Sequence, residues 1–123
     1  PSIKAECKDQ YIKNPKNINA NYMTMAFEST VKGKEDLAAA IHPIDSTLRP
    51  QLVHKEISPG FHNIISEFEK LTGVGGLLNT SLNIHGKPIV HKPIDVVKEI
   101  LMHELVDLNY IVFDNILLRA KLL

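Results

Sequence analysis

The densest group of side chains that could bind a small polar ligand is Asn79, Thr80, Ser81 and Asn83, which directly follows an apolar stretch. Side chains two residues apart on an extended strand point the same way, so Asn79, Ser81 and Asn83 would line one wall of a pocket. Amide and hydroxyl groups donate to phosphate oxygens, and an Asn oxygen also accepts from an NH2 group. The alternative is a polar strand end whose side chains bond to the following loop.

A second polar group lies upstream at residues 45–51, where Arg49 follows an Asp-Ser-Thr turn. The guanidinium group is planar and permanently charged, so it suits bidentate contact with a phosphate. The neighbouring turn would fix its direction. The alternative is a surface arginine paired with Asp45, which is the commoner fate of a single arginine.

The two groups, in this order, resemble the C-terminal domain of the O-carbamoyltransferase family, which includes nodulation-factor and antibiotic O-carbamoyltransferases. The resemblance runs from NYMT at residues 21–24 through DxTxRxQ at residues 45–51 and LNTSxN at residues 78–83 to GxPIVxxPxD at residues 86–95. Each motif is weak alone, whereas their ordered succession is specific.

The resemblance implies a two-part enzyme. Its N-terminal domain, of the actin-like ATPase type, would transfer a carbamoyl group to the hydroxyl of a small-molecule acceptor. Its C-terminal domain, which is YrdC-like, would form carbamoyl adenylate from carbamoyl phosphate and ATP by positioning and charge neutralisation. Matching positions imply these ligand-binding residues: Arg49, Asn79, Thr80, Ser81 and Asn83. Arg49 and Ser81 would be the catalytic residues, and no metal is expected.

The sequence departs from the family pattern at several positions. Ser46 stands where the family has glycine, and Leu82 stands where it has phenylalanine. Lys87 and Lys92 replace glutamate and threonine, so they would retune anion binding at the pocket rim or would simply be solvated. The chain begins at Pro1 without an initiator methionine. We therefore expect an excised, truncated piece that lacks an upstream basic segment and is catalytically incomplete.

Two other functions remain open. The chain could be a structural module that docks on the N-terminal domain without a ligand site of its own, or a simple nucleotide-binding module. A structural role predicts that Arg49→Ala leaves ligand binding unchanged. A nucleotide-binding module predicts affinity for ATP without any effect of carbamoyl phosphate.

Composition narrows the class of protein. The 123 residues suffice for a single domain, residues 1–123. Fourteen basic residues balance fourteen acidic ones, which gives no general field for a nucleic acid or an anionic membrane. No apolar run approaches the ~20 residues of a membrane span. The single cysteine, Cys7, cannot form an internal disulfide, so we expect a cytoplasmic protein.

Other motifs carry little chemistry. His85, His91 and His103 lack the spacing of a zinc site. The sequence GVGG at residues 73–76 follows a predicted helix and precedes a strand, the reverse of the order in phosphate-binding loops. Ser81 lacks the GxSxG elbow of a hydrolase nucleophile.

Helical and strand patterns mix without strict alternation, which predicts an α+β fold with a mixed sheet. The best helix spans residues 59–72, where Ser58 and Pro59 give a start and Gly73 a stop. Its apolar stripe is Phe61, Ile64, Ile65, Phe68 and Leu71. Two further helices are expected, one at residues 2–11 with Ser2 as its cap and one at residues 93–104. Three strands are expected at residues 22–31, 48–54 and 76–81, and Gly33 would end the first of them. A hairpin is expected within residues 109–119, with its turn at Asp114 and Asn115. Residues 34–44 fit either element.

Overall fold

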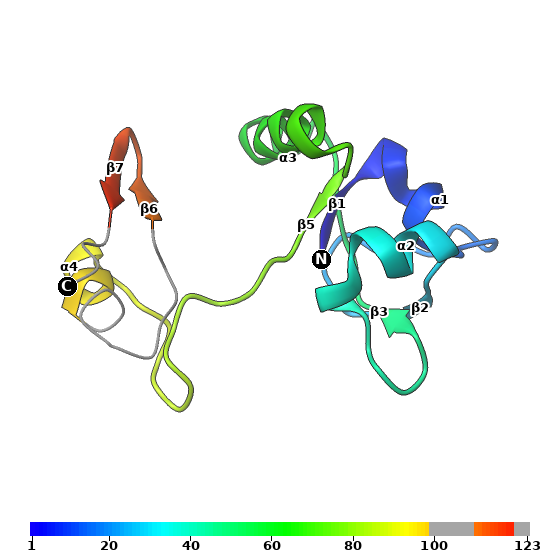
Figure 1. Cartoon of the computed structure of the whole chain (residues 1–123), viewed down its shortest axis with the longest axis horizontal. Helices are drawn as coiled ribbons and strands as arrows, with labels where there is room; N and C mark the ends of the chain where they lie inside the picture. The colour runs from blue at the N-terminus through cyan, green and yellow to red at the C-terminus, as the bar shows by residue number, and fades with distance from the viewer. Residues whose placement is uncertain (99–109, 120–123) are drawn as a thin grey trace. The chain divides into compact units, whose positions relative to one another are not determined.

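The computed structural model describes residues 1–98 and 110–119 (Figure 1). The chain forms two compact units, Pro1–Asn79 and Thr80–Leu123. Helices and strands are mixed along the chain, which confirms the predicted α+β class. That all 123 residues act as one domain stays a prediction.

The first unit contains the strands β1 (Ser2–Lys4), β2 (Phe27–Glu28), β3 (Thr47–Leu48), β4 (Gln51–Val53) and β5 (Gly76–Leu77), and the helices η1 (Ala5–Cys7), α1 (Lys8–Tyr11), α2 (Val31–Asp36), η2 (Ala38–Ala40) and α3 (Pro59–Thr72). The described elements of the second unit are α4 (Pro93–Val96), β6 (Tyr110–Phe113) and β7 (Ile116–Arg119).

A three-stranded sheet in the order β4-β1-β5 lies at the centre of the first unit. The sheet is mixed, as predicted. β1 runs parallel to β4 and antiparallel to β5, so Ser2 lies opposite Gln51 on one side and Leu77 on the other. The helix predicted at residues 2–11 ends at Tyr11 as expected, but its predicted start is wrong, because Ser2 is fully buried in β1 and helical backbone begins only at Ala5. Pairing on both sides satisfies the backbone groups of β1 and decides its conformation.

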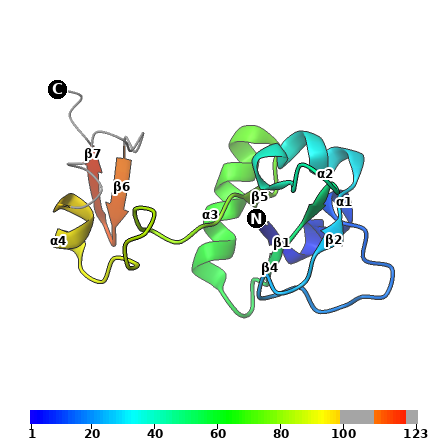
Figure 2. The ribbon, with the colours of Figure 1, turned by 90° about the horizontal axis from the view of Figure 1, so that it is seen from below.

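The two faces of this sheet pack against different helices (Figures 1 and 2). Ile3 points toward α1 and α2 and joins Leu37 in the main core. Ser2 and Lys4 point to the opposite face, because successive side chains on a strand alternate. On that face Lys4 reaches Glu69 of α3. α3 therefore covers the polar side of the sheet.

The best predicted helix, α3, is confirmed. It begins at Pro59 and ends at Gly73, whose φ of 80° gives the left-handed C-cap. Ile65 of its apolar stripe is fully buried, whereas Ile64 is 60% exposed and Leu71 is 86% exposed. The stripe is therefore wider than the contact of α3 with the sheet.

The strand predicted at residues 22–31 is much shorter than expected. Only Phe27–Glu28 forms β2, because the positive φ of 55° at Met23 interrupts the extended backbone. Gly33 does not end a strand but lies inside α2. The N-cap of α2 is Thr30, whose Oγ1 accepts a hydrogen bond from the Gly33 N–H.

Two further predicted strands are divided or shortened. Residues 48–54 contribute to two sheets, because β3 pairs with β2 whereas β4 pairs with β1. Pro50 separates them and has no N–H for a ladder. The strand expected at residues 76–81 ends at Leu77, the last residue opposite β1. Residues 34–44, left open above, contain the end of α2 followed by η2.

In the second unit, α4 begins at Pro93, and Asp95 Oδ2 accepts a hydrogen bond from Lys92 N at 3.0 Å. β6 and β7 form the predicted hairpin, which turns at Asp114 with a φ of 52°. The expected continuation of α4 to residue 104, including His103, lies outside the described residues. Among the helices that are described, none has the length and apolar character to cross a membrane.

Candidate functional site

Three polar side chains form a hydrogen-bonded group on the central sheet, which we call the Gln51 group. Gln51 Oε1 accepts a hydrogen bond from Ser2 Oγ at 2.8 Å and another from Asn79 Nδ2 at 3.0 Å. Ser2 is fully buried, and Gln51 and Asn79 are half-buried. Gln51 comes from β4, Ser2 from β1, and Asn79 from the residues just after β5. The fold thus preforms a set of donors and acceptors where β5 ends. Sequence reasoning selected Asn79 and missed both of its partners.

Arg49 is exposed beside an open depression of about 440 Å³. His42, Asp45 and Thr47 also line this depression. Asp45 Oδ1 accepts hydrogen bonds from N and Oγ1 of Thr47 at 3.0 and 2.8 Å, and it lies 3.1 Å from His42 Nδ1. The bond from the Thr47 backbone N–H is the main reason why the pKa of Asp45 is lowered.

The alternative pairing of Arg49 with Asp45 is not observed. Across residues 1–98 and 110–119, no ion pair engages Arg49. Pro1 is a near neighbour: its carbonyl oxygen accepts a hydrogen bond from Gln51 N at 2.8 Å. Arg49 therefore carries a charge that is open to an anion near the start of β1.

Thr80, Ser81 and Asn83 belong to the second unit, where they lie in a loop rather than in the predicted strand. Ser81 Oγ donates to Asn83 Oδ1 at 2.5 Å. Asn83 Nδ2 donates to two carbonyl oxygens of the following turn, at 3.2 and 3.0 Å. Asn83 thus holds this turn, as the alternative interpretation of a polar strand end predicts. Thr80 and Ser81 are exposed. The structure brings Ser81 and Asn83 together, while Asn79 takes part in the Gln51 group of the first unit.

A charged cluster fastens α3 to the sheet. The nearly buried Lys4 Nζ lies 2.5 Å from Glu69 Oε2 and 3.5 Å from Glu6 Oε1, and His62 Nε2 lies 2.8 Å from the same Glu6 oxygen. The hydrogen bond with Glu69 raises the pKa of Lys4. Cys7 Sγ donates to Glu69 Oε1 at 3.5 Å, and burial raises the pKa of the Cys7 thiol. A thiol with a raised pKa is a poor nucleophile at neutral pH.

This cluster predicts how stability depends on pH. The hydrogen bond from Lys4 lowers the pKa of Glu69 below its usual 4.5. The contribution of Glu69 to the free energy of unfolding is therefore fully present above pH 4.5 and is lost as the pH falls through the lowered pKa. In Lys4→Met the free energy of unfolding should fall less between neutral pH and a pH below 4.5 than it does in the wild type. Urea unfolding at the two pH values would measure this difference. Lys70→Met is the matched control, because Lys70 binds Glu67 at the surface. An acid loss in Lys4→Met as large as that of the wild type would contradict the assignment.

The sequence matches the protein family described as Carbamoyltransferase C-terminus over residues 1–120. It is 32% identical to the uncharacterized protein MJ1058 of Methanocaldococcus jannaschii, over 82% of this chain and 16% of that protein. It is 31% identical to nodulation protein NolNO of Sinorhizobium fredii, over 98% of this chain and 17% of that protein. It is 34% identical to a 3'-hydroxymethylcephem-O-carbamoyltransferase of Amycolatopsis lactamdurans, over 59% of this chain and 14% of that protein. The chain spans less than a fifth of the length of these relatives.

Proposed function

The chain belongs to the carbamoyltransferase C-terminus family, and from this premise we propose that it binds carbamoyl phosphate and ATP. In a longer cytoplasmic O-carbamoyltransferase it would form carbamoyl adenylate for transfer to a hydroxyl acceptor. The partner would be an N-terminal domain of the actin-like ATPase type in the same chain. The observation that carries the proposal is the family match over residues 1–120, and a relative named as an O-carbamoyltransferase supports it.

Arg49 would bind the phosphate in this proposal. Its side chain is exposed, and the carboxylate of the preceding turn, Asp45, is already bonded to Thr47. A guanidinium group offers two parallel N–H donors to a phosphate and neutralises part of its charge. Arg49 would therefore hold the anion and offset the negative charge that develops during adenylation.

The family resemblance implies further ligand-binding residues: Asn79 in the first unit and, in the loop of the second unit, Thr80, Ser81 and Asn83. Both donors of Asn83 are used by its turn, so Asn83 contributes an acceptor oxygen. Ser81 Oγ donates to that oxygen without ligand and would turn its hydrogen to a ligand oxygen instead. Thr80 is exposed and offers a further hydroxyl. These contacts position the reactants, which is most of what adenylyl transfer requires of a protein.

The test is an amide NMR titration of this chain with carbamoyl phosphate and then with ATP. We expect saturable shifts around Arg49 and at residues 79–83 with each ligand. Lys16, in the loop after α1, provides a reference position that should not move. No saturable shift at millimolar concentrations of either ligand would contradict the proposal for this chain. Shifts with ATP alone, without any effect of carbamoyl phosphate, would favour a simple nucleotide-binding module.

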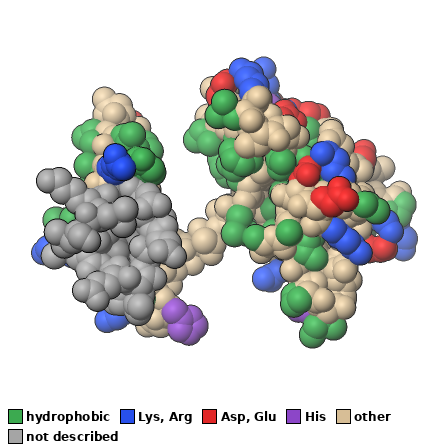
Figure 3. Space-filling model, viewed as in Figure 1, with side chains coloured by type: hydrophobic (Ala, Val, Ile, Leu, Met, Phe, Trp, Pro, Cys, Tyr) green, Lys and Arg blue, Asp and Glu red, His purple; other side chains and the backbone are tan. Residues whose placement is uncertain are grey.

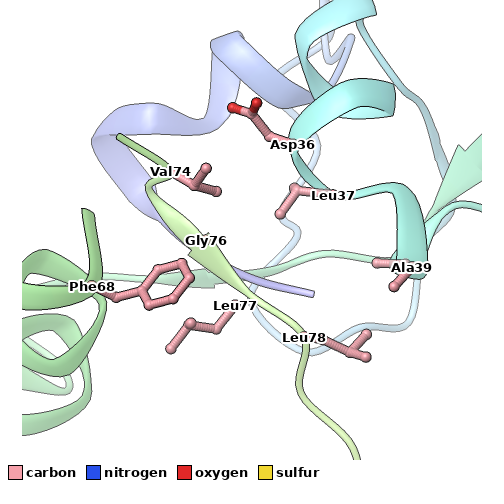
Figure 4. A pocket seen from close by; sticks show the side chains of 9 residues that line it. Asp36, Leu37, Ala39, Phe68, Val74, Gly76, Leu77 and Leu78 are labelled. Carbon is pink, nitrogen blue, oxygen red and sulfur yellow. The ribbon is translucent and has the colours of Figure 1, made fainter. Parts of the chain in front are cut away.

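A second candidate function is docking on another domain, and the apolar surface of the first unit favours it. Ile64 and Leu71 of α3 are exposed, and Figure 3 shows apolar side chains among the charged ones on this unit. A hollow of about 160 Å³ lies between α3, β5 and the α2–η2 segment. Figure 4 shows Phe68, Leu77 and Leu37 around it. A purely docking module predicts that neither ligand shifts any amide.

A further inference from the structure

We propose that Gln51 determines the specificity of the site for a carbamoyl group by fixing the orientation of the Asn79 side chain. Gln51 Oε1 accepts from Asn79 Nδ2, so the Asn79 amide nitrogen faces Gln51 and its Oδ1 is left for a ligand. An oxygen in that place accepts a hydrogen bond from the NH2 of a carbamoyl group. This inference rests on the proposed function, since it takes carbamoyl phosphate as the ligand.

Ser2 fixes the orientation of the Gln51 amide. The Ser2 hydroxyl is fully buried, and within the described residues its hydrogen has one acceptor, Gln51 Oε1 at 2.8 Å. If the Gln51 amide turned over, its NH2 would face Ser2, and the hydroxyl hydrogen would lose its acceptor. A buried donor without an acceptor is costly, so the oxygen of Gln51 stays toward Ser2. The pairing of Ser2 with Gln51 in the β1–β4 ladder holds both backbones in register.

The orientation of the Gln51 amide determines the orientation of the Asn79 amide. Gln51 Oε1 has two lone pairs, and Ser2 and Asn79 use both. Asn79 must therefore present its NH2 to Gln51, because its own oxygen would otherwise face another oxygen. No hydrogen bond from residues 1–98 or 110–119 reaches Asn79 Oδ1, and the side chain is half-buried. The acceptor is thus fixed in direction before a ligand arrives.

The consequence is discrimination between a carbamoyl and an acetyl group. The two differ by NH2 against CH3 and are nearly equal in size, so shape alone separates them poorly. An acceptor that cannot turn away is left unpaired by a methyl group, and a site built to bond an NH2 rejects such an analogue. With one neutral hydrogen bond at stake, carbamoyl phosphate should bind about tenfold more tightly than acetyl phosphate.

The experiment compares binding of carbamoyl phosphate and acetyl phosphate to this chain by NMR titration. Gln51→Met has the length of glutamine without the acceptor, and its preference for carbamoyl phosphate should fall from about tenfold to nearly none. Gln51→Glu keeps an acceptor oxygen and should retain the preference. Gln10→Met is the matched control, because Gln10 is exposed on α1. Without ligand, the side-chain NH2 resonances of Asn79 should lose their hydrogen-bonded shifts in Gln51→Met alone.

The outcomes separate this inference from the proposed function. A full preference retained by Gln51→Met overturns the role of Gln51 and leaves the proposed function standing. The same holds if the wild type binds both phosphates equally. If neither phosphate binds the wild type, the proposed function fails and the inference fails with it. A structural role for Gln51 would lower stability without changing the preference, and unfolding in urea measures stability separately.

Discussion

Gly33→Ala should destabilise the first unit by about 3 kcal/mol, because it forces two closely packed helices apart. A β-carbon at Gly33 would lie 2.3 Å from the carbonyl oxygen of Tyr11 and 3.3 Å from Thr30 Oγ1. The Tyr11 carbonyl cannot move away freely, since it accepts the hydrogen bond from Thr30 N at 3.0 Å. Tyr11 itself is fully buried, and its hydroxyl accepts from Gly75 N at 2.8 Å. Both sides of the contact are therefore held, and α2 would have to separate from α1.

Urea unfolding followed by circular dichroism measures this effect. Gly60→Ala is the matched control, because nothing lies within 4 Å of a β-carbon there and Gly60 lies in the first turn of α3. Removing a glycine from a helix without a clash should stabilise the protein by about 0.5 to 1 kcal/mol. The two substitutions thus have opposite expected signs. Wild-type stability in Gly33→Ala would show that α1 and α2 do not pack as described.

Gly33 also shows where sequence reasoning fails. A glycine that ends a strand and a glycine that admits a neighbouring helix look the same in one sequence. The capping signals around α3 and the turn signal at Asp114 are local, and both were predicted. The conformation of Ser2 depends instead on β4, which pairs with it from 49 residues away. Serine suits a helix cap when read alone, so the central strand could not be found from local pattern.

The residues of the candidate site also differ in whether a local sequence pattern could identify them. Arg49 and Asn79 were selected from residue type and motif order, which a sequence displays directly. Gln51 is the last residue of the motif at residues 45–51, and the sequence alone assigned it no role. Its proposed role depends on hydrogen bonds to Ser2 and Asn79 across the sheet, which a local pattern does not show. The roles of Thr80, Ser81 and Asn83 in binding stay predictions. For Asn83 the turn-holding alternative describes the contacts that the structure contains.

Arg49→Ala should weaken binding of carbamoyl phosphate to this chain by about a hundredfold, since the proposed bidentate charged contact would contribute about 3 kcal/mol. NMR titration at fixed ionic strength measures the dissociation constants. Arg119→Ala is the matched control, because Arg119 is the other arginine of the sequence. Its guanidinium carbon lies 5.8 Å from the centre of the Tyr110 ring in the hairpin. Binding that is unchanged in Arg49→Ala would contradict the phosphate-binding role of Arg49 and would assign the anion to other residues.

Arg49→Lys separates the charge of Arg49 from its geometry. Lysine keeps the positive charge but presents an ammonium group rather than a planar fork, so it cannot form two parallel hydrogen bonds to one phosphate. If Arg49 neutralises charge from the edge of the depression, the lysine variant should bind nearly as well as the wild type. If Arg49 holds the phosphate through both N–H groups, affinity should fall about tenfold, between the wild type and Arg49→Ala. We expect the second result, because Asp45 is bonded to Thr47 and does not pair with the guanidinium group, which can then bind an anion through two N–H groups.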